Sequence, residues 1–230
     1  MTIAENIAQV RANIAAAAKE AGRRPEDLLL VGASKMNGAA ACREAIAAGI
    51  DALGENRVQE MTAKLQENAY EGAPLHFIGH LQRNKVKQVV GKAELIQSVG
   101  SLELLDEIEK AAAKLKLIQN ILLEVNIGGE EAKSGFAPAK VLAGAETALE
   151  KGHVRVLGLM TIPPADADRE MNLRYFDRVR ALFIDMNEKL FHNELRYLSM
   201  GMSGDYEDAI RAGATMVRVG TAIFGSRHYV

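Results

Sequence analysis

The sequence has little of several features that define whole classes of protein. Cys42 is its single cysteine, which excludes an intramolecular disulfide and a cysteine-based metal cluster. Only 5 prolines occur among the 230 residues, and no Gly/Ser-rich or Pro-rich linker divides the chain. Its length alone allows two small domains or one α/β barrel. Because no linker is present, we expect a single domain that spans residues 1–230.

The chain also lacks a strong charge and a long apolar run. Its net charge is -2 at pH 7, so it has no electrostatic footprint for nucleic acid. No stretch is long and apolar enough to cross a bilayer. Glu5 and Arg11 precede any long apolar run, unlike the start of a signal peptide. We therefore expect a cytoplasmic protein without a nucleic-acid or membrane partner, and its 48% hydrophobic residues are enough for a substantial core.

The chain begins with a helical pattern and then alternates between strand-like and helix-like segments. Apolar residues recur at helical spacing at Ile3, Ile7, Val10 and Ile14. Eight short runs rich in strand-forming residues follow, separated by helix-like stretches: 27–34, 50–55, 74–79, 93–99, 120–127, 154–162, 194–200 and 215–220. This alternation indicates βαβ units and a parallel sheet. It predicts an α/β fold, a single (β/α)8 TIM barrel with an extra N-terminal helix. The alternative is an open doubly wound sheet, although no G-x-G-x-x-G follows the first run.

Polar residues gather where the predicted strands end. In a barrel of this kind the C-terminal strand ends form the mouth that carries the active site. These ends supply Ser34 and Lys35, residues 54–57, Gly79 and His80, Asn126, Met160 and Thr161, Ser199 with Gly201 and Ser203, and Arg218 with Gly220 and Thr221. We expect all these groups to converge on one mouth.

Most of these residues also have a purely structural interpretation. A lysine after a strand, such as Lys35, is most often solvated, and His80 alone is more often structural than catalytic. Asn56 is equally suited to capping the helix that follows it. Arg218 differs, because it lies inside the apolar run "MVRVG", where a charged guanidinium needs a partner or a polar pocket.

The last two strand ends carry a signal for phosphate. "SMGMSGD" and "RVGTAIFG" each place glycine beside serine or threonine just before a helix, and "TAIFG" fits a short extra helix. Loops after strands seven and eight of a barrel often bind phosphate, although ordinary turns are also rich in glycine and serine. A lysine kept neutral by its surroundings attacks carbonyl groups. A phosphate-bearing aldehyde such as pyridoxal 5′-phosphate would satisfy both features.

Six stretches of the sequence resemble the motifs of the pyridoxal phosphate homeostasis proteins, the YggS-like or PROSC family. They occur in the family's order over nearly the whole chain: "GENRVQE", "HFIGHLQRNK", "EVNIGGEEAKSG", "LGLMTIP", "LSMGMSGDYEDAI" and "MVRVGTAIFG". The family is a single-domain barrel related to the N-terminal domain of alanine racemase, called fold type III. The resemblance implies a barrel that binds pyridoxal phosphate and acts in vitamin B6 and amino-acid homeostasis.

The resemblance also implies a role for each residue at the mouth. Lys35 would form a covalent aldimine with the cofactor, and Arg218 would face its pyridine nitrogen. The phosphate would be bound by the backbone N–H groups of Gly220 and Thr221 and by the hydroxyls of Thr221 and Ser199. Gly201 and Ser203 lie in the same loop as Ser199. Asn56 would lie beside the ring, and His80 would line the mouth. The family commonly has Ser-Lys-Thr after the first strand, whereas this chain has "SKMNG", which leaves the shape of that loop open.

The resemblance favours a carrier over an enzyme. An arginine at the pyridine nitrogen disfavours protonation there and makes the ring a weaker electron sink. The related racemases carry a C-terminal β domain whose tyrosine is a second base; we expect that domain to be absent, and Tyr229 lies in no motif that would replace it. The expected function is to hold pyridoxal phosphate and release it to apo-enzymes, as a monomer without catalytic residues. The alternatives are a weak amino-acid racemase, a Schiff-base aldolase, and a barrel with a vestigial pocket that acts only through partners.

Overall fold

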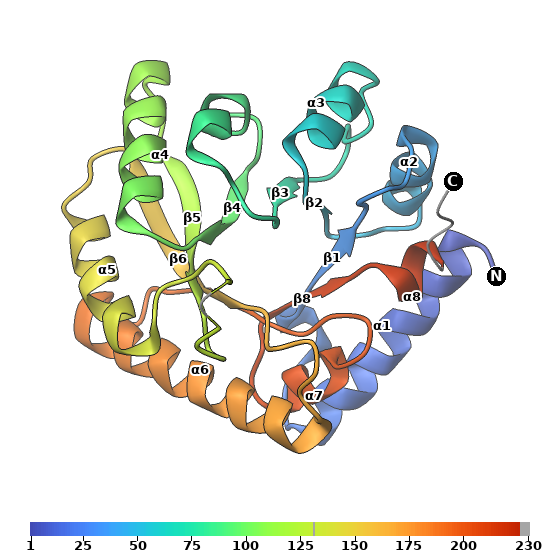
Figure 1. The fold of residues 1–230 in the computed structure, drawn as a ribbon. Helices are drawn as coiled ribbons and strands as arrows, with labels where there is room; N and C mark the ends of the chain where they lie inside the picture. The colour runs from blue at the N-terminus through green and yellow to red at the C-terminus, as the bar shows by residue number, and fades with distance from the viewer. Residues whose placement is uncertain (131, 226–230) are drawn as a thin grey trace.

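A computed structural model describes residues 1–130 and 132–225, and in this part of the chain eight strands close into one barrel (Figure 1). The strands are β1 (Leu29–Ala33), β2 (Ala52–Glu55), β3 (Leu75–Phe77), β4 (Leu95–Val99), β5 (Gln119–Val125), β6 (Val154–Thr161), β7 (Tyr197–Ser199) and β8 (Met216–Val219). Each strand runs parallel to the next, and β8 pairs with β1. Every strand overlaps the run predicted for it. The (β/α)8 barrel is therefore confirmed, and the open doubly wound sheet is wrong.

Helices surround the barrel on its outer side (Figure 1). They are α1 (Ile3–Glu20), α2 (Ala39–Ala47), α3 (Val58–Gln66), α4 (Leu102–Leu115), α5 (Val141–Leu149), α6 (Arg169–Leu190), α7 (Tyr206–Arg211) and α8 (Thr221–Phe224), with 3₁₀ helices η1 (Pro25–Asp27), η2 (Arg83–Gln88) and η3 (Pro138–Lys140). The predicted extra N-terminal helix is α1, which Thr2 and Glu5 start with a capping box. The short helix predicted from "TAIFG" is α8. Of the helices described, none combines the length and the apolarity that a membrane span requires.

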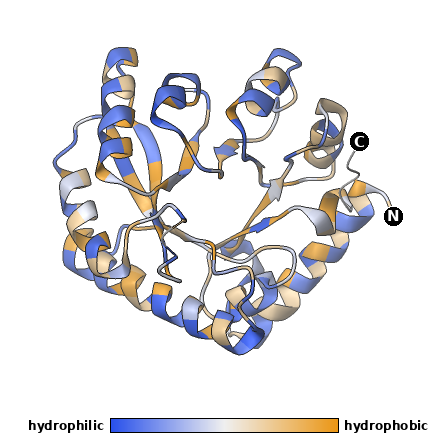
Figure 2. Ribbon diagram, in the orientation of Figure 1, coloured by the Kyte–Doolittle hydropathy of each residue, from blue (hydrophilic) through white to orange (hydrophobic). Residues whose placement is uncertain are grey.

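Two apolar clusters hold the fold together. The larger one lies between the strands and the helices, and Figure 2 shows hydrophobic colouring on the strands and on the helix faces turned toward them. The smaller one fills the inside of the barrel with Val31, Ala52, Leu95, Leu122, Met160 and Met216. Side chains of a strand alternate between its two faces, so the next inward-facing residue lies two positions on.

That alternation changes the barrel interior from apolar to polar toward the strand ends. Gln97 lies two residues after Leu95, Glu124 two after Leu122, and Arg218 two after Met216. All three polar side chains are buried. A permanently polar layer inside a barrel is costly unless its groups bind one another or a ligand. The fold therefore places these polar side chains next to the smaller apolar cluster, nearer the C-terminal ends of the strands.

Candidate functional site

The pairing of β1 with β8 brings the two ends of the sequence together at the mouth. Gly32 pairs with Val219, one residue before Ala33 and Gly220 respectively. A Cβ atom built on Gly220 would lie 3.3 Å from the Ala33 carbonyl oxygen, so the ends of β1 and β8 are in contact there. Lys35 follows Ala33 by two residues and is partly buried. The lysine loop and the loop after β8 are therefore neighbours, as the predicted site requires.

The Arg218 guanidinium is held by a chain of hydrogen bonds inside the barrel. Its Nη1 donates to Ser199 Oγ at 2.5 Å, and its Nη2 donates to the Thr161 carbonyl oxygen at 2.8 Å. Ser199 Oγ donates to Gln97 Oε1 at 2.7 Å, and Gln97 Nε2 lies 3.0 Å from His76 Nδ1. Because an amide nitrogen only donates, His76 Nδ1 is the acceptor and the ring is neutral. The chain crosses the barrel from β8 to β3.

Burial and charge act against each other around Arg218. Burial lowers the pKa of Arg218 to about 10, and the nearby Asp205 and Glu124 carboxylates oppose this shift. The guanidinium therefore stays positively charged at neutral pH. Burial raises the pKa of Glu124, while the hydroxyl of Ser134, which donates to its Oε2 at 2.9 Å, and the charges of Arg218 and His80 oppose that rise. The mouth thus contains a fixed cation facing a buried carboxyl group.

The start of α8 presents backbone N–H groups to a hydroxyl oxygen. The N–H groups of Gly220 and Ala222 donate to Ser203 Oγ at 3.1 and 3.3 Å. Both lone pairs of that oxygen then accept, which leaves its O–H to donate elsewhere. Thr221 lies between the two donors and is exposed. This arrangement is compatible with phosphate, whose oxygens accept from backbone N–H groups at a helix start and from hydroxyl donors.

Gly201 is required by the packing of the loop that carries Ser203. Its φ is +93°, and a Cβ at this position would lie 2.6 Å from Ala209 Cβ and 2.9 Å from Tyr206 Cα. The Gly201 carbonyl accepts from the Arg218 N–H at 3.0 Å. Glycine therefore fixes the loop against α7 and ties it to β8.

Asn56 and His80 have different surroundings. The N-cap of α3 is Arg57, so Asn56 does not cap this helix. Its Oδ1 is buried and has no hydrogen-bond partner in the described residues, which marks it as an atom that a ligand could satisfy. His80 is exposed and lines a cleft of ≈ 680 Å³ with Ser98 and Gly135.

Two of the strand-end residues do not reach the mouth with their side chains, and a third is bonded within its own loop. Ser34 and Glu55 turn outward to the helices, where Ser34 Oγ donates to Glu55 Oε1. Asn126 Nδ2 donates to the Glu130 carbonyl at 2.8 Å within its own loop. The expectation that all strand-end groups converge is wrong for Ser34 and Glu55. The reason for Ser34 and Glu55 is the alternation of the strand, which turns only every second side chain into the barrel.

Sequence reasoning missed three polar residues of the interior. Glu124 gives the same signal as Arg218, because it is the only charged residue in the apolar run "NILLEVNI". His76 gives a weaker signal as the single polar residue in "PLHFIG". Gln97 gives a weaker one still, because "AELIQSV" also contains Glu94 and Ser98. Tyr229 lies outside the described residues. Within residues 1–130 and 132–225, no group of three or more His, Cys, Asp or Glu side chains is placed to hold a metal ion.

Comparison with known proteins supplies independent information about this barrel. Residues 6–228 match the family model of the alanine racemase N-terminal domain. The chain is 43% identical to the pyridoxal phosphate homeostasis protein of Aquifex aeolicus, with 100% of both chains covered. It is 44% identical to the protein of the same name from Pseudomonas aeruginosa, covering 99% of this chain and 97% of that one.

Solved structures share the same barrel. PipY of Synechococcus elongatus with PLP bound superposes with a TM-score of 0.83 at 32% identity, covering 97% of this chain and 100% of that one. Alanine racemase of Clostridium difficile has a TM-score of 0.73 at 18% identity. It covers 99% of this chain, which matches 57% of the racemase. At that identity the racemase is evidence for the fold alone.

Proposed function

This chain belongs to the family of pyridoxal phosphate homeostasis proteins, and we propose that it binds pyridoxal 5′-phosphate at the mouth formed by β1 and β8. The observation that carries the proposal is the contact between the end of β1, which leads to Lys35, and Gly220 at the start of α8. The carbonyl-reactive amine and the phosphate-binding N–H groups must lie at one mouth if a single small molecule is to use both.

Lys35 is the proposed covalent anchor. Its neutral amine would add to the cofactor aldehyde carbon, and the carbonyl oxygen would leave as water, so that a Schiff base forms. Addition of water, or of an amine from another protein, would reverse this step and release the cofactor. A reversible covalent bond of this kind suits a carrier that supplies apo-enzymes.

The phosphate is assigned to the loop after β7 and the start of α8. The N–H groups of Gly220 and Thr221 would donate to phosphate oxygens, with the Gly220 N–H giving up its bond to Ser203 Oγ. The hydroxyls of Ser203 and Thr221 would donate to the phosphate as well. Gly201 shapes this loop, as its packing on α7 requires. Ser199 is better suited to holding Arg218 than to reaching the phosphate, because its single O–H already donates to Gln97.

The ring is assigned to the space between Arg218, Asn56 and His80. A guanidinium that stays charged would keep the pyridine nitrogen unprotonated, which weakens the ring as an electron sink. Asn56 offers a buried oxygen with no partner in the described residues. Holding and release of the cofactor fit this arrangement better than catalysis does.

A weak amino-acid racemase or a Schiff-base aldolase is the second candidate, and Glu124 is the observation that favours it. This buried carboxyl group lies on the inner face of β5, and burial raises its pKa, as is common for general acids and bases in active sites. Sustained conversion of L-alanine to D-alanine, lost in Glu124→Gln, would establish catalysis and overturn the carrier proposal. Trapping of a sugar phosphate on the lysine would instead establish the aldolase.

Titration of the apo-protein with pyridoxal phosphate tests the proposed function. The absorption band of a protonated Schiff base should grow to one equivalent in the wild type and be absent in Lys35→Ala. An apo-enzyme added to the loaded protein should then gain activity while the band declines. An unchanged spectrum of the wild-type protein would refute the proposal.

A further inference from the structure

Helix α3 holds both peptide groups that flank Lys35. The carbonyl oxygen of Ser34 accepts from Lys64 Nζ at 2.9 Å. The N–H group of Met36 donates to Glu60 Oε2 at 2.8 Å. Because Glu60 and Lys64 are four residues apart on α3, they lie on the same face of the helix, one turn from each other. The backbone before and after the Lys35 Cα atom is therefore fixed from one neighbouring element.

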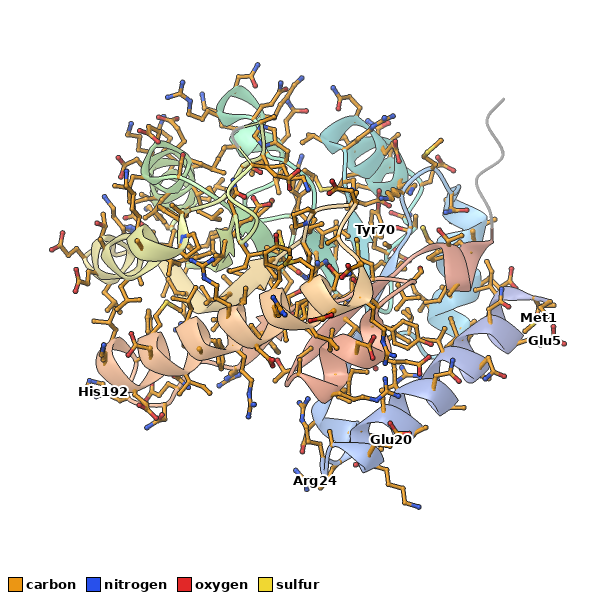
Figure 3. The ribbon with its side chains drawn as sticks, turned by 60° about the horizontal axis from the view of Figure 1, so that its bottom comes forward. Met1, Glu5, Glu20, Arg24, Tyr70 and His192 are labelled. Carbon is orange, nitrogen blue, oxygen red and sulfur yellow. The ribbon has the colours of Figure 1, made fainter. Side chains whose placement is uncertain are left out.

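Glu55 anchors the lysine that makes the first of these contacts. Its Oε1 accepts from Lys64 Nζ at 2.5 Å, from Tyr70 OH at 3.1 Å and from the Ser34 hydroxyl. The side chains of Glu55 and Lys64 are 0% and 7% exposed. Tyr70 is buried as well, and Figure 3 places it within the outline of the molecule, whereas Glu20 and His192 lie at its edge. Burial and the Glu55 carboxylate raise the pKa of Tyr70, which therefore remains a neutral donor.

Stability alone does not account for a buried ion pair at this place. Removing two charges from water costs several kcal/mol each, and apolar residues of the same size often stabilise a fold equally well or better. Glu55 Oε2 is also buried without a hydrogen-bond partner in the described residues, which adds to the cost. What Lys64 provides and an apolar residue does not is a donor for the Ser34 carbonyl.

The second contact holds a backbone conformation that few residues adopt. Met36 has a φ of +63°, and the residue is 49% exposed, so packing of the side chain does not explain the conformation. A left-handed residue other than glycine costs about 1–2 kcal/mol. The bond from the Met36 N–H to Glu60 offsets part of this cost. The loop "SKMNG" is therefore a strained turn that α3 holds in place.

We propose that Glu60 and Lys64, with Glu55 as the anchor of Lys64, are positioning residues that hold the Lys35 backbone so that its amine meets the aldehyde of the bound cofactor. They touch neither the cofactor nor the reacting atoms; they act through the two peptide groups beside Lys35. This inference rests on the proposed function, because the orientation of Lys35 matters only if its amine forms the Schiff base. We call these three residues the α3 clamp.

The test compares two ligands that differ only at the reacting carbon. Pyridoxal phosphate carries the aldehyde, whereas pyridoxine phosphate carries an alcohol there and binds without covalent chemistry. In Glu60→Met and in Lys64→Met, stopped-flow absorbance should record Schiff-base formation about tenfold to a hundredfold slower than in the wild type. The affinity for pyridoxine phosphate should stay within twofold, because the phosphate-binding loop is intact.

Two further variants separate positioning from a general loss of structure. Glu60→Gln keeps an oxygen that accepts from the Met36 N–H and should restore the wild-type rate. Gln59→Met changes an exposed residue on the same helix and should also react at the wild-type rate. If Lys64→Met does not fold, the rate of Schiff-base formation in Glu60→Met tests the inference alone. Glu60 is partly exposed, and its ion pair with Arg57 is not buried.

The outcomes distinguish this inference from the proposed function. If the wild type forms the Schiff base and Glu60→Met forms it equally fast, the clamp is wrong and the proposed function stands. A parallel loss of pyridoxine phosphate binding in Glu60→Met would also overturn the clamp, since it would indicate a disordered site. If the wild type forms no Schiff base at Lys35, both fail together.

Discussion

Replacing His76 with glutamine should make the barrel less sensitive to acid. His76 lies at the far end of the hydrogen-bond chain that holds Arg218, and it is buried inside the barrel. Its Nδ1 accepts from Gln97, so protonation would remove an acceptor as well as bury a charge. A glutamine side chain still offers an oxygen to Gln97 and does not titrate in this range.

The size of the stability loss in acid follows from the pKa of the buried His76 ring. Burial lowers the pKa of His76 from 6.5 to about 4. Between these two values the unfolded chain binds a proton at this position and the folded chain does not, so stability falls as the pH falls. The full stability is present above pH 6.5. A shift of this size corresponds to about 3 kcal/mol, lost progressively by about pH 4.

Urea denaturation of the wild type and His76→Gln between pH 7 and pH 4 measures this term. Other acidic groups contribute to both curves, so the difference between the proteins isolates His76. The free energy of unfolding of the wild type should fall by about 3 kcal/mol more than that of the variant. His192→Asn, at an exposed position, should follow the wild type. If the wild-type and His76→Gln curves run parallel within about 0.5 kcal/mol, the neutral buried ring is wrong.

Three more substitutions test other parts of the site. Met36→Gly should raise the free energy of unfolding by about 0.5–1 kcal/mol in urea denaturation, because glycine relieves the left-handed strain; a decrease would contradict the strained turn. Arg218→Ala should weaken retention of pyridoxal phosphate in dialysis and shift the absorption band, and an unchanged band would place Arg218 away from the ring. Gly201→Ala should lower the free energy of unfolding by about 1–3 kcal/mol, because its Cβ would overlap α7; an unchanged midpoint of denaturation would contradict that packing.

The sequence predicts the barrel well because its signals are local. Each strand is an apolar run of a few residues, and each helix has its own periodicity, so their order and number follow without long-range information. Arg218 and Lys35 could be nominated for the same reason, as charged residues beside or within apolar runs. The pairing of β8 with β1 brings the two residues to the same mouth, and this pairing is part of any closed barrel that the sequence predicts.

The details of the site depend on contacts between distant parts of the chain. Lys64 resembles an ordinary solvated helix lysine in sequence, and only the packing of α3 against β2 buries it beside Glu55. In the "SKMNG" loop the positive φ belongs to Met36 and not to the turn-forming Asn37 or Gly38 that follow it, so the sequence does not show which residue is left-handed. The family resemblance assigns the Ser199 hydroxyl to the phosphate, and it does not indicate the bond from this hydroxyl to Gln97, which comes from another strand.

Borohydride reduction followed by peptide mass mapping tests the central claim most directly. The purified protein is loaded with pyridoxal phosphate, reduced, digested and analysed, with Lys64→Met and Lys35→Ala treated in parallel. A pyridoxyl phosphate group should be found on the peptide that carries Lys35 in the wild type, and on no peptide in Lys35→Ala. Labelling of another lysine at equal yield, or labelling that persists in Lys35→Ala, would contradict the assignment of Lys35 as the covalent anchor.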